Sequence, residues 1–167
     1  MADAESSRDA PPDSRCIAVR IRDGLYGLSV EEVQEVIALR PLTRVFHAPE
    51  AIAGVTSLRG EVLPVVDVGV LLGGSADSSP GPLARIVVVR EPKGRKRRAG
   101  FLIDELGGLR EVPASGLGEL PQTVAEAIRE LCLGVIPQAP PCSVLGVTRV
   151  LDAPVLADFA GDPAESP

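Results

Sequence analysis

The sequence predicts an all-β fold with a few short helices, and three observations support this prediction. Sixteen prolines and seventeen glycines are spread through the 167 residues, which indicates many short elements joined by turns. Apolar, β-branched runs of strand length recur, for example at 17–21, 62–66 and 86–89. Aromatic residues make up only 2% of the chain, so the interior must be built from Val, Leu, Ile and Ala.

Composition and charge exclude several classes of function. The formal net charge of -6 argues against binding to nucleic acid, which requires an extended basic surface. No apolar stretch approaches the ~18 residues needed to span a bilayer, and the start of the chain lacks the pattern of a signal peptide. We therefore expect a cytoplasmic protein with no nucleic-acid partner and no direct membrane insertion.

The cysteines and the histidine do not suggest a metal site. Cys16, Cys132 and Cys142 fit no metal-ligand spacing, and we expect them to be buried as small hydrophobic residues. His47 has no second histidine or nearby cysteine, so a surface position is expected for it. The sequence predicts neither a metal nor a cofactor.

Three segments lack the composition of a core. Residues 1–14 and 161–167 are rich in Ala, Ser, Asp, Glu and Pro, and we expect both tails to be disordered. Residues 15–160 are predicted to form a single domain. The stretch GGSADSSPGP at 73–82 is the clearest linker and is expected to divide this domain into two lobes.

The first half of the chain is predicted to begin with two strands and a helix. Residues 16–21 alternate with period two, and Asp23-Gly24 makes the turn to a second strand at 25–28. At Ser29–Ile37 the sequence SVEEVQEVI has a capping box, Ser29 with Glu32, and an apolar stripe at helical spacing. We expect most of its glutamates to form a solvated face.

A β-hairpin is predicted at 55–66, with Arg59-Gly60 as its turn. Arg59 lies at the tip, where burial would be costly, so we expect it at the surface. Asp67 ends the second strand, and its side chain is expected to cap a helical turn at 68–72.

The second half is predicted to contain strands at 83–90 and 99–106, a helix at 121–131, and strands at 132–136 and 143–147. The sequence PKGRKRR at 92–98 joins the first two of these strands. Its basic residues form either a solvated hairpin loop or a surface for an acidic partner.

No known catalytic motif is complete in this sequence. There is no nucleophile motif, P-loop, dinucleotide fingerprint or zinc-protease motif. Val65-Val66-Asp67-Val68-Gly69 resembles the apolar-apolar-Asp-Thr-Gly element of retroviral-type aspartic proteases, in which two aspartates share a proton. Val68 replaces the supporting Ser or Thr, and a helix cap also accounts for Asp67.

Two stretches, LYGLSVEEVQEVI and LTRVFHAPEAIAGVTSLRGEVLPVVDV, resemble the CheW family of coupling proteins in bacterial chemotaxis. The resemblance runs without a gap from about Leu25 to Val68 and includes Val33-x-Glu35-Val36, Leu58-Arg59-Gly60 and Pro64-x-x-Asp67. The second half is similar to the family more loosely, through ARIVVV, GFLIDEL and LGVI.

This resemblance implies two intertwined five-stranded β-barrel subdomains that share a hydrophobic core, without catalysis. It implies an adaptor that couples the cytoplasmic tip of methyl-accepting chemoreceptors to the regulatory domain of a CheA-type histidine kinase. The resemblance further implies other CheW-like domains as partners and recruitment of the adaptor to membrane-associated receptor arrays. Matching family contact positions implies a partner-binding set of Val33, Glu35, Val36, Gly54, Arg59, Leu106 and Leu109.

The chain departs from the family pattern at several positions. Ser57 replaces the usual Asn before Leu-Arg-Gly, and Gly69 stands where an Arg commonly follows the Asp. A divergent CheW-like scaffold in a signalling array outside chemotaxis is therefore an alternative, and an aspartic-protease-like enzyme that uses Asp67 is a second one.

Overall fold

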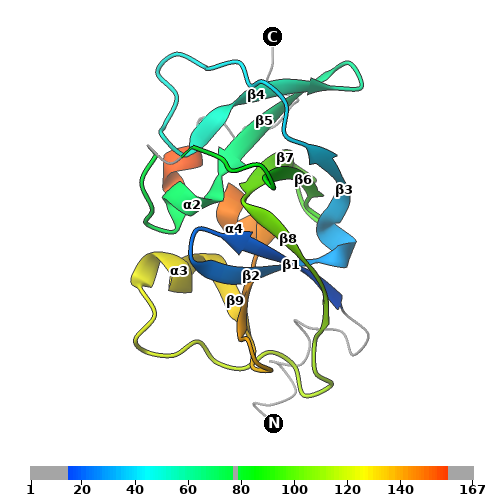
Figure 1. Cartoon of the computed structure of the whole chain (residues 1–167), viewed down its shortest axis with the longest axis vertical. Coiled ribbons are helices and arrows are strands. Elements are labelled where there is room, and N and C mark those ends of the chain that lie inside the picture. Colours follow the sequence, from blue (N-terminus) through cyan, green and yellow to red (C-terminus); the bar gives the residue numbers. More distant parts are fainter. Residues whose placement is uncertain (1–14, 77–78, 158–167) are drawn as a thin grey trace.

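The computed structural model describes residues 15–76 and 79–157, and the strands in these ranges form two five-stranded sheets (Figure 1). The all-β prediction is confirmed. Sheet A contains β1 (Arg15–Ile21), β2 (Gly24–Ser29), β8 (Glu105–Glu111), β9 (Cys132–Ile136) and β10 (Cys142–Leu145). Sheet B contains β3 (Val33–Ala38), β4 (Ile52–Leu58), β5 (Glu61–Asp67), β6 (Arg85–Arg90) and β7 (Arg98–Ile103).

The two sheets have matching strand arrangements. Their orders are β8-β1-β2-β10-β9 and β3-β6-β7-β5-β4, and each sheet has one parallel pair, β2 with β10 or β5 with β7. The expected barrels are not closed, because no ladder joins the two edge strands of either sheet among the described residues. Side chains link the edges instead, through Glu35 and Arg59 in sheet B and through Arg110 and the β9–β10 loop in sheet A.

The chain consists of two similar topological repeats, β1–β5 and β6–β10. Each repeat makes a hairpin, sends its third strand into the other sheet, makes a second hairpin there and ends in a short helix. The segment 73–82 separates these repeats and does not separate the sheets, since β5 before it and β6 after it both belong to sheet B. The lobes are therefore intertwined, and each takes strands from both halves of the chain.

The helices are short. They are η1 (Val30–Glu32), α2 (Val68–Leu71), α3 (Glu126–Leu131), α4 (Val147–Leu151) and η2 (Pro154–Leu156). None of the helices in the described ranges is long and apolar enough to cross a membrane. The predicted helix at 121–131 is present only in its last six residues.

The helix predicted at Ser29–Ile37 is wrong. A single 3-10 turn, η1, is followed at Val33 by strand β3, which pairs with β6. Ser29 makes no side-chain capping hydrogen bond. The segment is rich in β-branched residues, and pairing with the buried strand β6 outweighs its weak helical preference.

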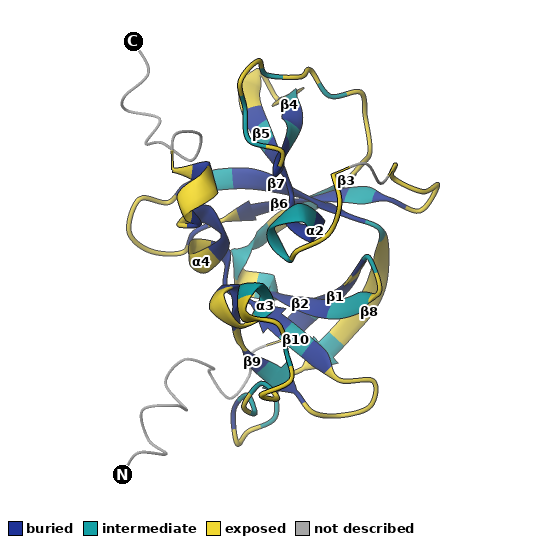
Figure 2. Cartoon of the chain, turned by 90° about the vertical axis from the view of Figure 1, so that its left-hand side faces the viewer, coloured by how far each residue is buried: buried dark blue, intermediate teal, exposed yellow. Residues whose placement is uncertain are grey.

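The largest hydrophobic cluster draws buried residues from both sheets, which confirms the shared core. It includes Val19 and Leu28 of sheet A, Val66, Val87 and Phe101 of sheet B, and Val150 of α4. Sheet A has a second cluster around Cys16 and Cys142, and sheet B has smaller ones around Leu63 and Ile86. Figure 2 shows buried residues on strands of both sheets.

The predicted tails, 1–14 and 161–167, lie outside the described residues, as do residues 158–160 at the end of the predicted domain. The boundaries of the single domain stay a prediction.

Candidate partner-binding site

The edge strand β3 presents two valines on one face because it contains a bulge. Val33 is opposite Val89 and Val36 is opposite Val87, so the register shifts by one residue between them. In a regular strand, residues three apart point to opposite faces. The extra residue, Gln34, brings Val33 and Val36 to the same face, and both valines pack against the shared core.

The edge strand β8 repeats this arrangement in sheet A. Leu106 is opposite Val19 and Leu109 is opposite Ile17, with Gly107 as the extra residue. Gly108, at φ +90°, adopts a backbone conformation that favours glycine. Leu106 and Leu109 therefore share a face, yet they remain 41% and 62% exposed.

These four apolar residues occupy equivalent positions in the two repeats, since β3 and β8 are the third strands of their repeats and both are edge strands. Of the predicted apolar contact residues, the two valines are thus partly covered by the shared core, whereas the two leucines are exposed.

Glu35 and Arg59 are the charged part of the predicted site, and they form an ion pair. The guanidinium donates two hydrogen bonds to the carboxylate, one of them from Nη2 to Oε2 at 2.9 Å and a closer one from Nη1 to Oε1. The hydrogen bond from Arg59 lowers the pKa of Glu35, and the same bond raises the pKa of Arg59. The ion pair is bidentate, a geometry that fixes the orientation of the two groups as well as their distance.

The ion pair joins the two edges of sheet B. Glu35 lies on β3, whereas Arg59 lies in the turn of the β4–β5 hairpin, which forms the opposite edge. Arg59 has φ +50°, and its side chain is 72% exposed. Val62, three residues further along the hairpin, is 73% exposed. The predicted hairpin is confirmed, with an arginine and an apolar side chain offered to solvent at its tip.

Gly54 differs from the other predicted site residues, because it is buried. A Cβ at this position would lie 2.8 Å from the carbonyl oxygen of Thr43 and 2.9 Å from the Cβ of Leu42. Thr43 and Val55 exchange backbone hydrogen bonds of 2.9 Å, so residues 42–43 cover the edge of β4. Gly54 thus lets the loop that follows β3 pack against β4.

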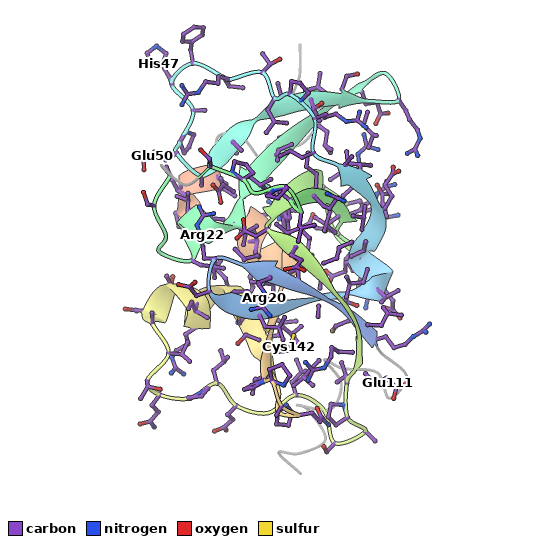
Figure 3. The ribbon with its side chains drawn as sticks, viewed as in Figure 1. Arg20, Arg22, His47, Glu50, Glu111 and Cys142 are labelled. Atoms are coloured by element: carbon purple, nitrogen blue, oxygen red, sulfur yellow. The ribbon has the colours of Figure 1, made fainter. Side chains whose placement is uncertain are left out.

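Arg22 is a residue that the sequence analysis missed. Its guanidinium Nη2 lies 3.3 Å and 3.4 Å from the two carboxylate oxygens of Asp67 and donates to the carbonyl of Ser75 at 2.9 Å. The expected cap is absent, because no backbone N–H of α2 donates a hydrogen bond to the Asp67 carboxylate. Figure 3 shows Arg22 beside α2. No local pattern indicates a pair formed by residues 45 positions apart.

Gly69 and Gly74 make the space for Arg22. A Cβ on Gly69 would lie 2.8 Å from the guanidinium carbon, and one on Gly74 would lie 3.2 Å from Nε. Gly69, which departs from the family pattern, therefore leaves room for Arg22 to reach Asp67.

The basic run at 92–98 is only partly a solvated loop. Lys93, Arg95 and Lys96 are exposed, but Arg97 is buried. The guanidinium of Arg97 binds Glu91 through Nε at 3.0 Å and Nη2 at 2.6 Å, and Asp152 at 2.6 Å. Burial favours a higher pKa for Glu91, but the hydrogen bonds and charge of Arg97 outweigh burial and lower that pKa. Arg97 thus ties β6 and β7 to the chain after α4.

The cysteines and His47 lie as expected. All three thiols are free and buried, and burial raises the pKa of Cys16 to about 11 and that of Cys132 to about 12. Such thiols stay protonated near neutral pH and are poor nucleophiles. His47 is exposed and projects from its loop (Figure 3). Within 15–76 and 79–157, no group of three or more His, Cys, Asp or Glu residues is placed to hold a metal ion.

Comparison with known proteins agrees with this architecture. The family model described as "CheW-like domain" matches residues 15–156. The probable chemotaxis protein CheW of Rhizobium etli is 28% identical over 124 residues, which cover 74% of this chain and 77% of that protein. Protein FrzA of Myxococcus xanthus is 33% identical over 135 residues, which cover 80% and 81% of the two chains.

A solved structure also has this fold. The scaffolding protein TtCheW of Thermoanaerobacter tengcongensis superimposes with a TM-score of 0.73 at 19% sequence identity. The superposition covers 86% of this chain and 95% of that one.

Proposed function

Because this chain belongs to the CheW-like domain family, we propose that it is a non-catalytic adaptor that couples chemoreceptor tips to the regulatory domain of a CheA-type histidine kinase. The names of its relatives, chemotaxis protein CheW and scaffolding protein TtCheW, support a coupling role in chemotaxis. Recruitment to membrane-associated receptor arrays follows from binding to receptors.

One observation carries the proposal. Five of the predicted contact residues outside the hairpin, Val33, Glu35, Val36, Leu106 and Leu109, lie on two edge strands that are equivalent in the two repeats. Glu35 in turn holds Arg59 of the hairpin tip. An adaptor needs apolar side chains that a partner can bury and charged groups beside them that set the register. These residues supply both.

The aspartic-protease alternative is not favoured by the surroundings of Asp67. Both of its carboxylate oxygens face the Arg22 guanidinium, and the carboxylate is largely buried. An acid–base pair of aspartates would need free oxygens within reach of a substrate and of each other.

The alternative of a CheW-like scaffold in an array outside chemotaxis keeps the same surface. The departures from the family pattern at Ser57 and Gly69 are the observations in its favour. Two sets of receptors and kinase from the source organism distinguish the two proposals, one set from its chemotaxis array and one from its other signalling array. Only one of the two sets should bind this protein.

The test is binding of the purified kinase regulatory domain and stimulation of kinase autophosphorylation in receptor-containing membranes. We expect the wild-type chain to bind and stimulate, and Arg59→Glu to lose at least about tenfold in affinity with an unchanged circular dichroism spectrum. Arg95→Glu makes the same charge change on an exposed loop and should bind normally.

A double variant separates two roles for Arg59. Glu35→Arg combined with Arg59→Glu restores an ion pair between the two positions with reversed charges. Recovery of binding would mean that Arg59 acts through Glu35, whereas continued loss would mean that Arg59 touches the partner. Failure of the wild-type chain to bind either partner would refute the adaptor proposal.

A further inference from the structure

The outer edge of β8 is open to pairing. β8 pairs with β1 on one side, and no strand of the described residues pairs with it on the other. Glu105, Leu106, Gly107, Gly108 and Leu109 are all exposed. Figure 2 shows exposed residues along β8. By contrast, residues 43 and 118 form bridges to the edge strands β4 and β9. An exposed strand edge with apolar side chains is a template for pairing with another chain.

The sequence of this edge is complementary to itself. Residues 105–110 read Glu-Leu-Gly-Gly-Leu-Arg. If two copies pair antiparallel about a two-fold axis between the glycines, Glu105 of each copy lies opposite Arg110 of the other. Leu106 of each copy likewise lies opposite Leu109 of the other. Opposite charges and apolar side chains placed directly across a strand pair stabilise it.

The bulge makes this register possible. In an antiparallel pair, two opposite residues must both direct their backbone N–H and C=O groups toward each other, or both away. Residues three apart in a regular strand direct these groups to opposite sides. Because Gly107 is the extra residue, Leu106 and Leu109 have the same direction, as their pairing with Val19 and Ile17 indicates. The same holds for Glu105 and Arg110, which face Arg20 and Cys16.

The two faces of the strand separate the leucines from the charges. Leu106 and Leu109 lie on the side of Val19, a residue of the shared core. Arg110 lies on the other side and donates hydrogen bonds to the carbonyls of Pro140 at 2.9 Å and Gln138 at 2.7 Å. These bonds use two of its five N–H donors and hold the guanidinium in place.

We propose that β8 of one chain pairs antiparallel with β8 of a second copy, with Glu105 opposite Arg110 and Leu106 opposite Leu109, to form a two-fold dimer. The contact joins two copies of sheet A into one continuous sheet. A strand pair of this length buries less than the ~1,000 Å² of a stable interface, so the dimer is weak and depends on concentration. It also covers Leu106 and Leu109, and a partner that needs these leucines competes with it.

The proposal concerns the chain alone, and its test uses no partner, so its outcome is separate from that of the adaptor proposal. Sedimentation velocity of the full chain over a concentration series should show a monomer–dimer equilibrium. Glu105→Arg and Arg110→Glu each place like charges opposite one another and should weaken self-association by about tenfold. Glu119→Arg, the same charge change on an exposed loop, should leave association unchanged.

The mixed sample is the decisive measurement. When a Glu105→Arg chain pairs with an Arg110→Glu chain, opposite charges face each other at both ends of the strand pair. An equimolar mixture of the two variants should therefore associate like the wild type. Leu109→Lys keeps Arg110 in place and should abolish association. A wild-type chain that is monomeric at every concentration overturns the proposal. So does a dimer that survives both single charge variants, or a mixture that fails to associate.

Discussion

At the scale of single residues, Glu32 is the carboxyl group whose ionisation the fold opposes near neutral pH. It lies in η1, where the chain passes from β2 in sheet A to β3 in sheet B. Burial, and then the charges of Glu31 and Glu91, raise the pKa of Glu32 to about 7. Because the pKa of Glu32 in the folded state exceeds the ordinary glutamate value of 4.5, the associated stability is complete below pH 4.5 and is lost as pH rises through about 7.

We therefore expect Glu32→Gln to increase the free energy of unfolding at slightly alkaline pH by at most about 3 kcal/mol, and to leave it nearly unchanged below about pH 4.5. Urea unfolding at a series of pH values measures this difference. Glu50→Gln changes an exposed carboxylate in a loop and serves as the control. A parallel pH dependence in wild type and Glu32→Gln would contradict the expectation.

At the scale of elements, the bulge of β3 explains why the sequence of this strand resembled that of a helix. Apolar residues three apart, as at Val33 and Val36, usually mark one face of a helix. A bulge gives the same spacing to one face of a strand. The predicted helical stripe grouped Val33 with Ile37 and left Val36 at its edge, whereas the bulged strand groups Val33 with Val36 and turns Ile37 to the other face, opposite Ile86. Pairing with β6 decided that these residues lie on a strand.

The packing of the loop after β3 against β4 depends on Gly54, and this dependence can be tested. Gly54 has φ +150°, and a Cβ there would collide with backbone atoms of Thr43. We expect Gly54→Ala to lower the free energy of unfolding by about 1–3 kcal/mol in urea titrations. Gly81→Ala, where a Cβ meets nothing within 4 Å, should change it by less than about 0.5 kcal/mol. Equal effects of the two substitutions would show that the close approach of Gly54 to Thr43 does not matter for stability.

At the scale of the whole molecule, two arginines tie the sheets together at equivalent places. Arg22, after β1 of sheet A, reaches Asp67 at the end of β5 in sheet B. Arg97, before β7 of sheet B, reaches Leu151 and Asp152 at the end of α4, which follows β10 of sheet A. Each arginine comes from the first hairpin of one repeat and binds near the short helix that ends a repeat.

A double-mutant cycle tests the tie made by Arg22. Arg22→Ala should cost about 1–2 kcal/mol of unfolding free energy, and Gly69→Ala should cost a similar amount, because its Cβ displaces the guanidinium. In the Arg22→Ala background the change at Gly69 should be neutral or stabilising, since alanine is favoured over glycine in α2 by up to ~1 kcal/mol. Arg22→Ala combined with Gly54→Ala should be additive. If the unfolding free energy changes of Arg22→Ala and Gly69→Ala also add, Gly69 does not make room for Arg22.

The sequence by itself determined the strand-rich class, the hairpin with Arg59 at its tip and the buried cysteines, because alternation, turn residues and composition act over a few neighbouring positions. The family resemblance also supplied the candidate contact residues, whose role in binding stays a prediction. Only the tertiary structure decided that β3 is a strand, that segment 73–82 separates repeats within one sheet, and that Arg22 and Arg97 bind the carboxylates of Asp67 and Asp152. These features depend on strand pairing and on contacts between residues far apart in the chain, whose free energies outweigh local preferences that are each worth less than about 1 kcal/mol.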